Sequence, residues 1–271
     1  MRIQHNIMAL NSHRQLGNNN SAVSKSLEKL SSGYRINRAG DDAAGLAISE
    51  KMRAQITGLE AAQKNAEDGV SLVQTAEGAL TEVHSMLNRM VSLATQSANG
   101  TYSSANRAEM QKEIKALNAE IDRIGATSNF NGTKLFAAAG SIALHVGESS
   151  ADTNRISVTL KAMNANSIGV GSLDITTADA AKAAIDTIND AIDDISSMRS
   201  DFGALQNRLD HTINNLGVQN ENITAAESRI RDVDMAKEMM AYTKNSILVQ
   251  ASQAMLAQAN QVPQGVLQLL Q

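Results

Sequence analysis

The feature that most constrains the fold is a run of apolar and small residues whose spacing alternates between three and four without a slip. Its members are Leu59, Ala62, Ala66, Gly69, Val73, Ala76, Leu80, Val83, Leu87, Met90 and Ala94. This repeat is typical of a helix that packs along one seam against another helix. Asp41 and Asp42 precede the run as capping residues and Asn99-Gly100 follows it, so we predict one helix of about 55 residues, about 80 Å long.

The same spacing returns twice further along the chain. A second helix is predicted on Met110, Ile114, Leu117, Ile121 and Ile124, folding back after a turn at residues 99–104 and ending at Gly125. A third helix is predicted from Ile185 to Ile223, with a phase slip near Ile195. Alternating apolar residues at 142–146 and 156–160 predict a β-hairpin, whose apolar face should lie against the helices.

Composition agrees with a binding or structural role. The 271 residues are 42% hydrophobic and 19% charged, which is typical of a folded chain. Aromatic residues make up only 2% and there is a single proline, so the core must consist of aliphatic side chains on long helices. A net charge of −4 disfavours nucleic-acid binding, and the absence of cysteine excludes disulfides and thiolate chemistry.

Catalytic and metal-binding patterns are weak throughout the sequence. No two histidines have the spacing of a zinc-binding helix, and no nucleophile, base and oxyanion set emerges. Asp186, Asp190, Asp193 and Asp194 share one side of the third helix, which we interpret as a solvated acidic face rather than a cation site. We therefore expect no enzymatic activity, no cofactor and no metal.

The two ends of the chain differ from its middle. Residues 1–10 lack the apolar stretch and cleavage site of a secretory signal, so any export is expected to use another route. Residues 245–271 contain no charged side chain, but seven glutamines interrupt the apolar residues, which makes a transmembrane helix improbable. A long uncharged helix of this kind suits burial among other protein helices.

Both ends carry apolar side chains in addition to those that form the predicted seams of the central helices. We predict that these residues mediate self-assembly: Ile3, Ile7, Leu10, Val23, Leu27, Leu30, Ile247, Leu248, Met255, Leu256, Leu267 and Leu270. Isolated helices with weak stripes are marginal in water. Our hypothesis is that both ends are largely disordered in the free chain and become helical when they pack against each other and against neighbouring subunits.

Several long motifs resemble those of the bacterial flagellins. Residues 30–37 (LSSGYRIN) and 41–49 (DDAAGLAIS) are similar to the N-terminal signature of that family, and residues 227–234 (ESRIRDVD) are similar to its C-terminal signature. The similarity extends through residues 89–99, 130–136 and the uncharged last helix. It therefore covers almost the whole chain, with only about residues 141–180 generic.

The resemblance implies a mainly α fold: an antiparallel coiled-coil rod with a small β-hairpin, plus terminal helices that pair in the filament. The inner D0 domain would comprise residues 1–41 and 227–271. The adjoining D1 domain would comprise residues 42–180 and 181–226, without the outer D2 and D3 insertions of longer members. The implied function is that of a structural subunit, exported unfolded through the flagellar type III apparatus and polymerised at the tip of an extracellular filament for swimming motility.

The resemblance also implies partners besides the chain itself. These are the flagellar secretion chaperone on the C-terminal tail, the hook-associated junction and cap proteins, and the export apparatus. The Toll-like receptor of animals that senses flagellin recognises a D1 face, whose matching positions here are Arg89, Leu93 and Glu113. Taken singly, Arg89 and Glu113 are equally well interpreted as ordinary solvated charges, and Leu93 as a flank of the seam.

Two other functions compete with the filament subunit. A hook–filament junction protein shares helical ends with flagellin but usually matches its signatures less fully. An intracellular coiled-coil signalling or granule-coating protein, or an enzyme built into the hairpin region, would not explain an uncharged, glutamine-rich tail paired with an amphipathic N-terminus. The strength of both motifs favours flagellin.

Overall fold

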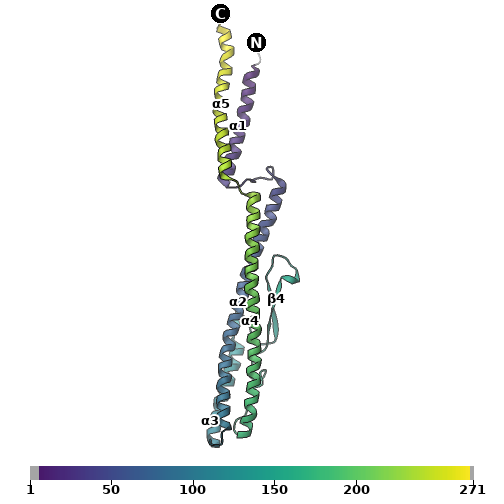
Figure 1. The fold of residues 1–271 in the computed structure, drawn as a ribbon, viewed down its shortest axis with the longest axis vertical. Helices are drawn as coiled ribbons and strands as arrows, with labels where there is room; N and C mark the ends of the chain where they lie inside the picture. The colour runs from purple at the N-terminus through teal and green to yellow at the C-terminus, as the bar shows by residue number, and fades with distance from the viewer. Residues whose placement is uncertain (1–5, 269–271) are drawn as a thin grey trace. The chain divides into compact units, whose positions relative to one another are not determined.

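The computed structural model describes residues 6–268, with side chains described for residues 6–261. Five long helices dominate it (Figure 1): α1 (Ile7–Ser32), α2 (Ala43–Ala98), α3 (Ser104–Thr127), α4 (Ala178–Arg231) and α5 (Met235–Gln268). The short strands β1 (Asn129–Phe130), β2 (Thr133–Lys134), β3 (Gly140–His145) and β4 (Arg155–Leu160) lie between α3 and α4, with the 3₁₀ turn η1 (Asp152–Asn154) before β4. The predicted mainly α fold is confirmed.

The chain divides into two compact units. Residues 1–56 and 221–271 form one, called here the terminal unit, and residues 57–220 form the other, the central unit. The first turns of α2 belong to the terminal unit, where Arg231 pairs with Glu50 and where Gly45 lies against Ile36. The domain limits that the flagellin resemblance implies, at 41/42 and 226/227, lie closer to the chain ends and stay a prediction.

The long helix predicted between residues 42 and 99 is confirmed as α2, with 56 residues. Asp42 caps it, since its carboxylate accepts a hydrogen bond from the Gly45 N–H at 2.9 Å. The apolar side chains of the predicted seam, from Leu59 to Ala94, are at most 2% exposed. The uninterrupted 3–4 spacing therefore identified the core face of α2 correctly.

Helix α4 supplies the longest complementary seam of the central unit. Its buried residues are Ala181, Ala184, Ile188, Ala191, Ile195, Met198, Phe202, Leu209 and Leu216. Successive members are three, four or seven residues apart, with no slip. The phase slip predicted near Ile195 is therefore wrong. That prediction placed Ile185 and Ile192 on the seam, whereas both are only half-buried and alanines occupy the buried positions. Alanine lets the helices approach closely, but it carries little hydrophobic signal in the sequence.

The predicted hairpin is confirmed as the antiparallel pair β3–β4, in which Ile142 lies opposite Val158 and Leu144 opposite Ile156. It lies beside α4 (Figure 1) with Ile156, Val158 and Leu160 buried. Gly69 of α2 lies beneath it, where an added Cβ would meet the Leu144 Cδ1 and displace that side chain.

A second, smaller hairpin precedes β3. Strands β1 and β2 pair across Asn131 and Gly132, whose φ angles are 48° and 81°. Two consecutive left-handed residues make the tight turn that Asn-Gly favours between antiparallel strands.

The segment between β4 and α4 runs antiparallel along α3 and completes the core. Gln111 and Asn118 of α3 donate to the Leu173 and Val170 carbonyl oxygens at 2.8 Å, and Asp122 accepts from the Ala165 N–H at 2.7 Å. These polar residues hold the segment so that its apolar side chains, among them Met163, Val170 and Ile175, are buried.

Gly125 allows the closest approach of this segment, since a Cβ there would overlap the Met163 carbonyl oxygen. The prediction that the second helix ends at Gly125 is wrong. Helix α3 continues to Thr127, and the glycine serves packing instead of termination.

Candidate self-assembly surface

Helices α1 and α5 lie side by side and antiparallel within the terminal unit (Figure 1). In α1 the half-buried and buried positions include Ala9, Ser12, Leu16, Asn19, Val23, Ser26 and Leu30. In α5 they include Glu238, Tyr242, Asn245, Val249, Ser252, Leu256 and Ala259. Both sets keep the 3–4 spacing of a coiled-coil seam, which we call the first seam.

The first seam is narrow and partly polar. Asn19 donates from Nδ2 to the Ser252 hydroxyl at 3.1 Å, and Asn6 donates to the Ala259 carbonyl oxygen at 2.7 Å. Ser26 and Ala259 are its most buried side chains. Small and hydroxylated residues bury little apolar area, and most side chains of the first seam are only half-buried, whereas those of the α2 and α4 seams are buried.

The predicted self-assembly residues fall into two groups. Val23, Leu30 and Leu256 are half-buried in the first seam. The larger group stays exposed, from 39% to 62%: Ile7, Leu10, Leu27, Ile247, Leu248 and Met255. Ile3 and Leu270 lie outside the described residues, and Leu267 lies in α5 with its side chain outside the described part. Most of the described residues that the sequence predicted for self-assembly are therefore not buried by the pairing of α1 with α5.

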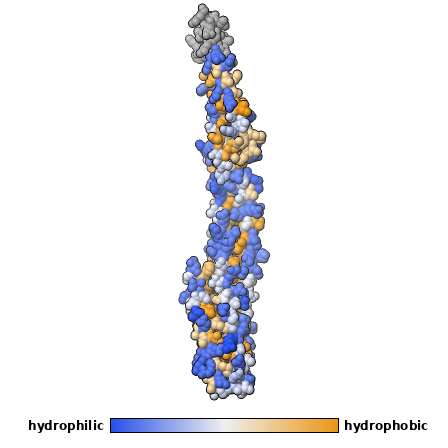
Figure 2. Space-filling model, turned by 90° about the vertical axis from the view of Figure 1, so that its left-hand side faces the viewer, coloured by the Kyte–Doolittle hydropathy of each residue, from blue (hydrophilic) through white to orange (hydrophobic). Residues whose placement is uncertain are grey.

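Helix α5 carries a second stripe on the side opposite the first seam. It consists of Ala236, Met240, Thr243, Ile247, Gln250, Ala254 and Ala257, all exposed, again spaced three and four. The nearest first-seam residue is two positions away, about 200° around a helix, for Ala236, Met240, Ile247 and Ala254. It is one position away, about 100°, for Thr243, Gln250 and Ala257. Figure 2 shows hydrophobic residues exposed among hydrophilic ones over the part that α1 and α5 form. Sequence reasoning missed this second stripe, although its heptad spacing was readable.

The two family-like motifs meet where the chain enters and leaves the α1–α5 pair. Tyr34 forms an isolated antiparallel bridge with Asp232, the Arg35 N–H donates to the Arg231 carbonyl oxygen at 2.6 Å, and the Val233 N–H donates to that of Gly33 at 3.0 Å. Gly33 ends α1 in the left-handed region, with φ of 76°. These bonds join the segment before α2 to the segment after α4.

The three positions matched to the receptor face lie on α2 and α3. The Arg89 guanidinium and the Glu113 carboxylate form an exposed ion pair at 2.7 Å, which raises the pKa of Arg89 further above its ordinary value. Leu93 is only 2% exposed and packs in the core. Of the three side chains, Arg89 and Glu113 are therefore available to a partner, and the receptor assignment stays a prediction.

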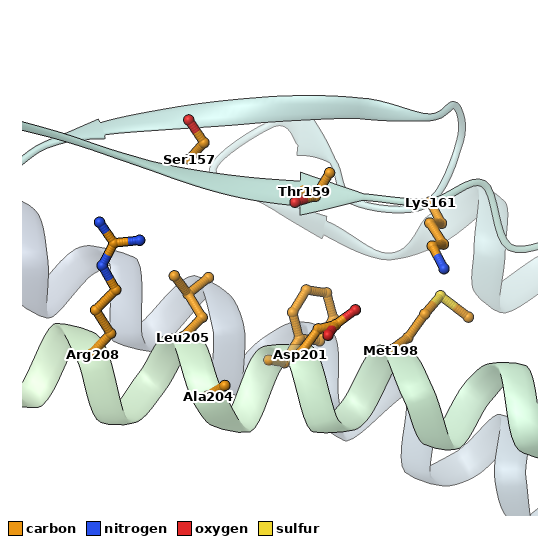
Figure 3. A pocket seen from close by; sticks show the side chains of 9 residues that line it. Ser157, Thr159, Lys161, Met198, Asp201, Ala204, Leu205 and Arg208 are labelled. Atoms are coloured by element: carbon orange, nitrogen blue, oxygen red, sulfur yellow. The ribbon is translucent and has the colours of Figure 1, made fainter. Parts of the chain in front are cut away.

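A groove of about 370 Å³ lies between β4 and α4 (Figure 3). Ser157, Thr159 and Lys161 line its strand side. Its helix side carries Met198, Asp201, Phe202, Ala204, Leu205 and Arg208. No histidine lies among these lining residues to activate either hydroxyl. It has the form of a gap beside an edge strand.

These observations define a class of protein. Its core is a helical bundle closed within one chain, and its terminal helices present apolar stripes that this chain leaves exposed. Within residues 6–268, no helix is long and apolar enough to cross a membrane. The fold is thus that of a helical chain whose exposed stripes are suited to packing against further helices.

Comparison with known proteins places the chain within this class. The model of the bacterial flagellin N-terminal helical region matches residues 3–141, and that of the C-terminal helical region matches residues 185–270. A flagellin of Bacillus subtilis is 52% identical and one of Halalkalibacterium halodurans is 54% identical, each alignment covering 100% of both chains. The fold is also similar, at a TM-score of 0.59 and 13% identity, to a putative flagellar hook-associated protein from Vibrio parahaemolyticus. That similarity covers 71% of this chain and all of the other, and it shows the fold alone.

The chain belongs to the bacterial flagellin family. Flagellins are structural proteins, and they self-assemble into the extracellular flagellar filament. The resemblance noted on residues 30–49 and 227–234 is therefore confirmed.

Proposed function

We propose that this flagellin polymerises through its two terminal helices, with the first seam joining α1 to α5 and the second stripe of α5 docking on a neighbouring subunit. The observation that carries the proposal is the exposure of that stripe, in which Ile247 is 60% and Met240 is 68% exposed. Met240, Ile247 and Ala254 repeat every seven residues along this stripe, and such an exposed apolar repeat favours a helical partner.

Folding and assembly are coupled in this proposal. The first seam buries mainly small and polar side chains, so it does not offset the ordering of two long helices, at roughly 1–2 kcal/mol of backbone entropy per residue. Docking of the second stripe adds to that burial, chiefly through Met240 and Ile247. Free subunits therefore stay unassembled in solution and order their ends on an existing filament tip, which acts as the template.

Seeded elongation tests the proposal. Purified full-length chain is added to filament fragments and growth is followed by light scattering and electron microscopy. Ile247→Gln keeps the helix propensity but removes the central apolar side chain of the second stripe, so elongation should fall strongly while the central unit unfolds as before.

The matched control is Lys237→Gln, an exposed change on the same helix outside the second stripe. It should elongate at nearly the unmodified rate. Deletion of residues 245–271 should leave a helical chain that does not assemble. Normal filaments from Ile247→Gln or from the truncation would overturn the role given to α5.

Membership of the flagellin family supports a proposal for the export route and the remaining partners. We propose that the chain leaves the cell unfolded through the flagellar type III apparatus and that its filament drives swimming. The secretion chaperone would cover exposed α5 side chains such as Leu248 and Met255 before export, and the hook-associated junction and cap proteins would meet α1 and α5 at the filament ends. Loss of secretion after deletion of α5, with normal synthesis, would support the chaperone assignment.

The exposed Arg89–Glu113 pair is the part of the central unit that we propose for contact with the flagellin-sensing Toll-like receptor. Arg89→Ala with Glu113→Ala should lower receptor activation by the free chain. The thermal unfolding of the chain should change little, because exposed ion pairs contribute about 0–1 kcal/mol. Unchanged activation would remove this assignment and leave both residues as surface charges.

A further inference from the structure

The methionines of the described residues range from buried to well exposed, with Met52, Met86 and Met110 half-buried. The chain has 12, and among the described residues Met90, Met163 and Met198 are buried. Five others are 50% to 68% exposed: Met8, Met235, Met239, Met240 and Met255. All five lie on α1 or α5, so the thioethers open to solvent gather on the terminal helices.

Met240 is the most exposed of the five and the only one in the second stripe of α5. It precedes Ile247 by seven residues, so the two side chains lie on the same helix face. An unbranched, polarisable side chain adapts well to a neighbouring helix. In the free chain the same side chain presents its sulfur directly to small oxidants in water.

We propose that Met240 is a site of reversible oxidation by peroxide that controls whether a free subunit can assemble. Hydrogen peroxide transfers one oxygen atom to the Met240 sulfur. An S–O bond forms as the O–O bond breaks, the sulfur loses two electrons, and the peroxide is reduced to water. The product, methionine sulfoxide, is polar, and methionine sulfoxide reductases convert it back.

The effect on assembly rests on the proposed docking of the second stripe. A sulfoxide at residue 240 would be buried against a neighbouring helix without a donor for its oxygen. One unsatisfied buried polar group weakens docking by roughly tenfold or more. Once a subunit has docked, the same burial shields the sulfur, so peroxide acts on free subunits and spares assembled ones.

Peptide mass spectrometry on the intact full-length chain tests the site. Free chain and seeded filaments are exposed to the same hydrogen peroxide concentration, and sulfoxide is measured at each methionine over time. In the free chain Met240 should oxidise at least roughly tenfold faster than Met90 or Met198, and assembly should slow it. Equal rates at these three residues, or no protection in filaments, would overturn the proposal.

Elongation of peroxide-treated subunits tests the consequence. Met240→Leu keeps an apolar side chain of similar volume that peroxide does not oxidise, so this variant should still elongate seeds after a treatment that stops the unmodified chain. Met255→Leu is the matched control, because Met255 is 59% exposed on α5 but lies outside the second stripe. Equal inhibition of Met240→Leu and the unmodified chain, or rescue by Met255→Leu alone, would contradict the assignment.

Two further measurements separate this inference from the proposed function. If untreated chain does not elongate seeds, the assembly role of α5 fails, and the mass spectra still decide whether Met240 is oxidised faster than the buried Met90 and Met198. If untreated chain elongates and peroxide leaves the rate unchanged, only the oxidation inference fails. Treating oxidised subunits with methionine sulfoxide reductases should restore elongation, and unrestored growth at full reduction would count against reversibility.

Discussion

The guanidinium of Arg231 lies over the ring of Tyr34, 4.7 Å from its centroid. Arg231 also pairs with Glu50 at 2.7 Å, and its side chain is only 13% exposed. A single arginine at the end of α4 thereby contacts the segment after α1 and the first turns of α2. The two motifs that resemble the flagellin signatures are joined through this side chain as well as through backbone bonds.

Removing this arginine should weaken the terminal unit. Arg231→Ala loses the cation–π contact and a partly buried ion pair, so we expect a loss of roughly 1–2 kcal/mol per subunit. Thermal dissociation of filaments, followed by circular dichroism, measures it. Arg229→Ala, an exposed change two residues away, is the control and should leave the transition in place. Identical transitions for both variants would contradict the role of Arg231.

Two glycine substitutions should change stability in opposite directions. Gly125→Ala places a Cβ against the Met163 carbonyl oxygen, which is backbone and cannot move aside cheaply, so it should destabilise the central unit by roughly 1–3 kcal/mol. Gly78→Ala lies in the middle of α2 with no atom near the new Cβ, and it should stabilise by roughly 0.5–1 kcal/mol. Urea unfolding measures both, and a stabilising Gly125→Ala would refute the close approach.

Gln111 should contribute more to the stability of the central unit than its place on a mostly polar helix suggests. Its amide donates to the Leu173 carbonyl oxygen and accepts from the Ile175 N–H, both at 2.8 Å. Gln111→Ala leaves the buried Ile175 N–H and the part-buried Leu173 carbonyl oxygen without this partner and should cost roughly 1–3 kcal/mol. Lys112→Ala, which breaks only an exposed ion pair, should cost at most about 1 kcal/mol in the same unfolding experiment. Equal costs would show that the segment does not depend on Gln111.

Acid should weaken the segment between β4 and α4, in which Asp174 lies. The Thr176 N–H donates to the Asp174 carboxylate at 2.8 Å, and this bond, helped by the Thr176 hydroxyl, holds the pKa of Asp174 below its ordinary value of 3.8. Because the folded state favours the ionised form, the stabilisation is complete above pH 3.8 and is lost as the pH falls through the lower, folded pKa.

Asp174→Asn removes this titration and should flatten the loss of stability below pH 3.8, as measured by thermal unfolding across the acid range. Asp190→Asn, which removes one exposed carboxylate of α4, is the charge-matched control. A steep acid loss that survives in Asp174→Asn would assign the effect to other groups.

The sequence alone determined the long helices, the α2 seam from Leu59 to Ala94, the β3–β4 hairpin and the flagellin resemblance. Large aliphatic side chains at regular spacing are a strong signal, because each one buried is favourable by itself. The apolar residues of α1 and α5 were identified for the same reason. Their spacing could not show which of them pair within the chain and which stay exposed.

Tertiary structure decided the features that depend on small or polar side chains. Ala181, Ala184 and Ala191 complete the α4 seam, and Ser12, Asn19 and Ser252 belong to the first seam of the terminal unit. Gln111 and Asn118 hold a connecting segment that looked generic. Alanine, serine and amide side chains gain their value only when a second backbone comes close enough to contact or hydrogen-bond them. That closeness depends on residues distant along the chain, so no local pattern reveals it.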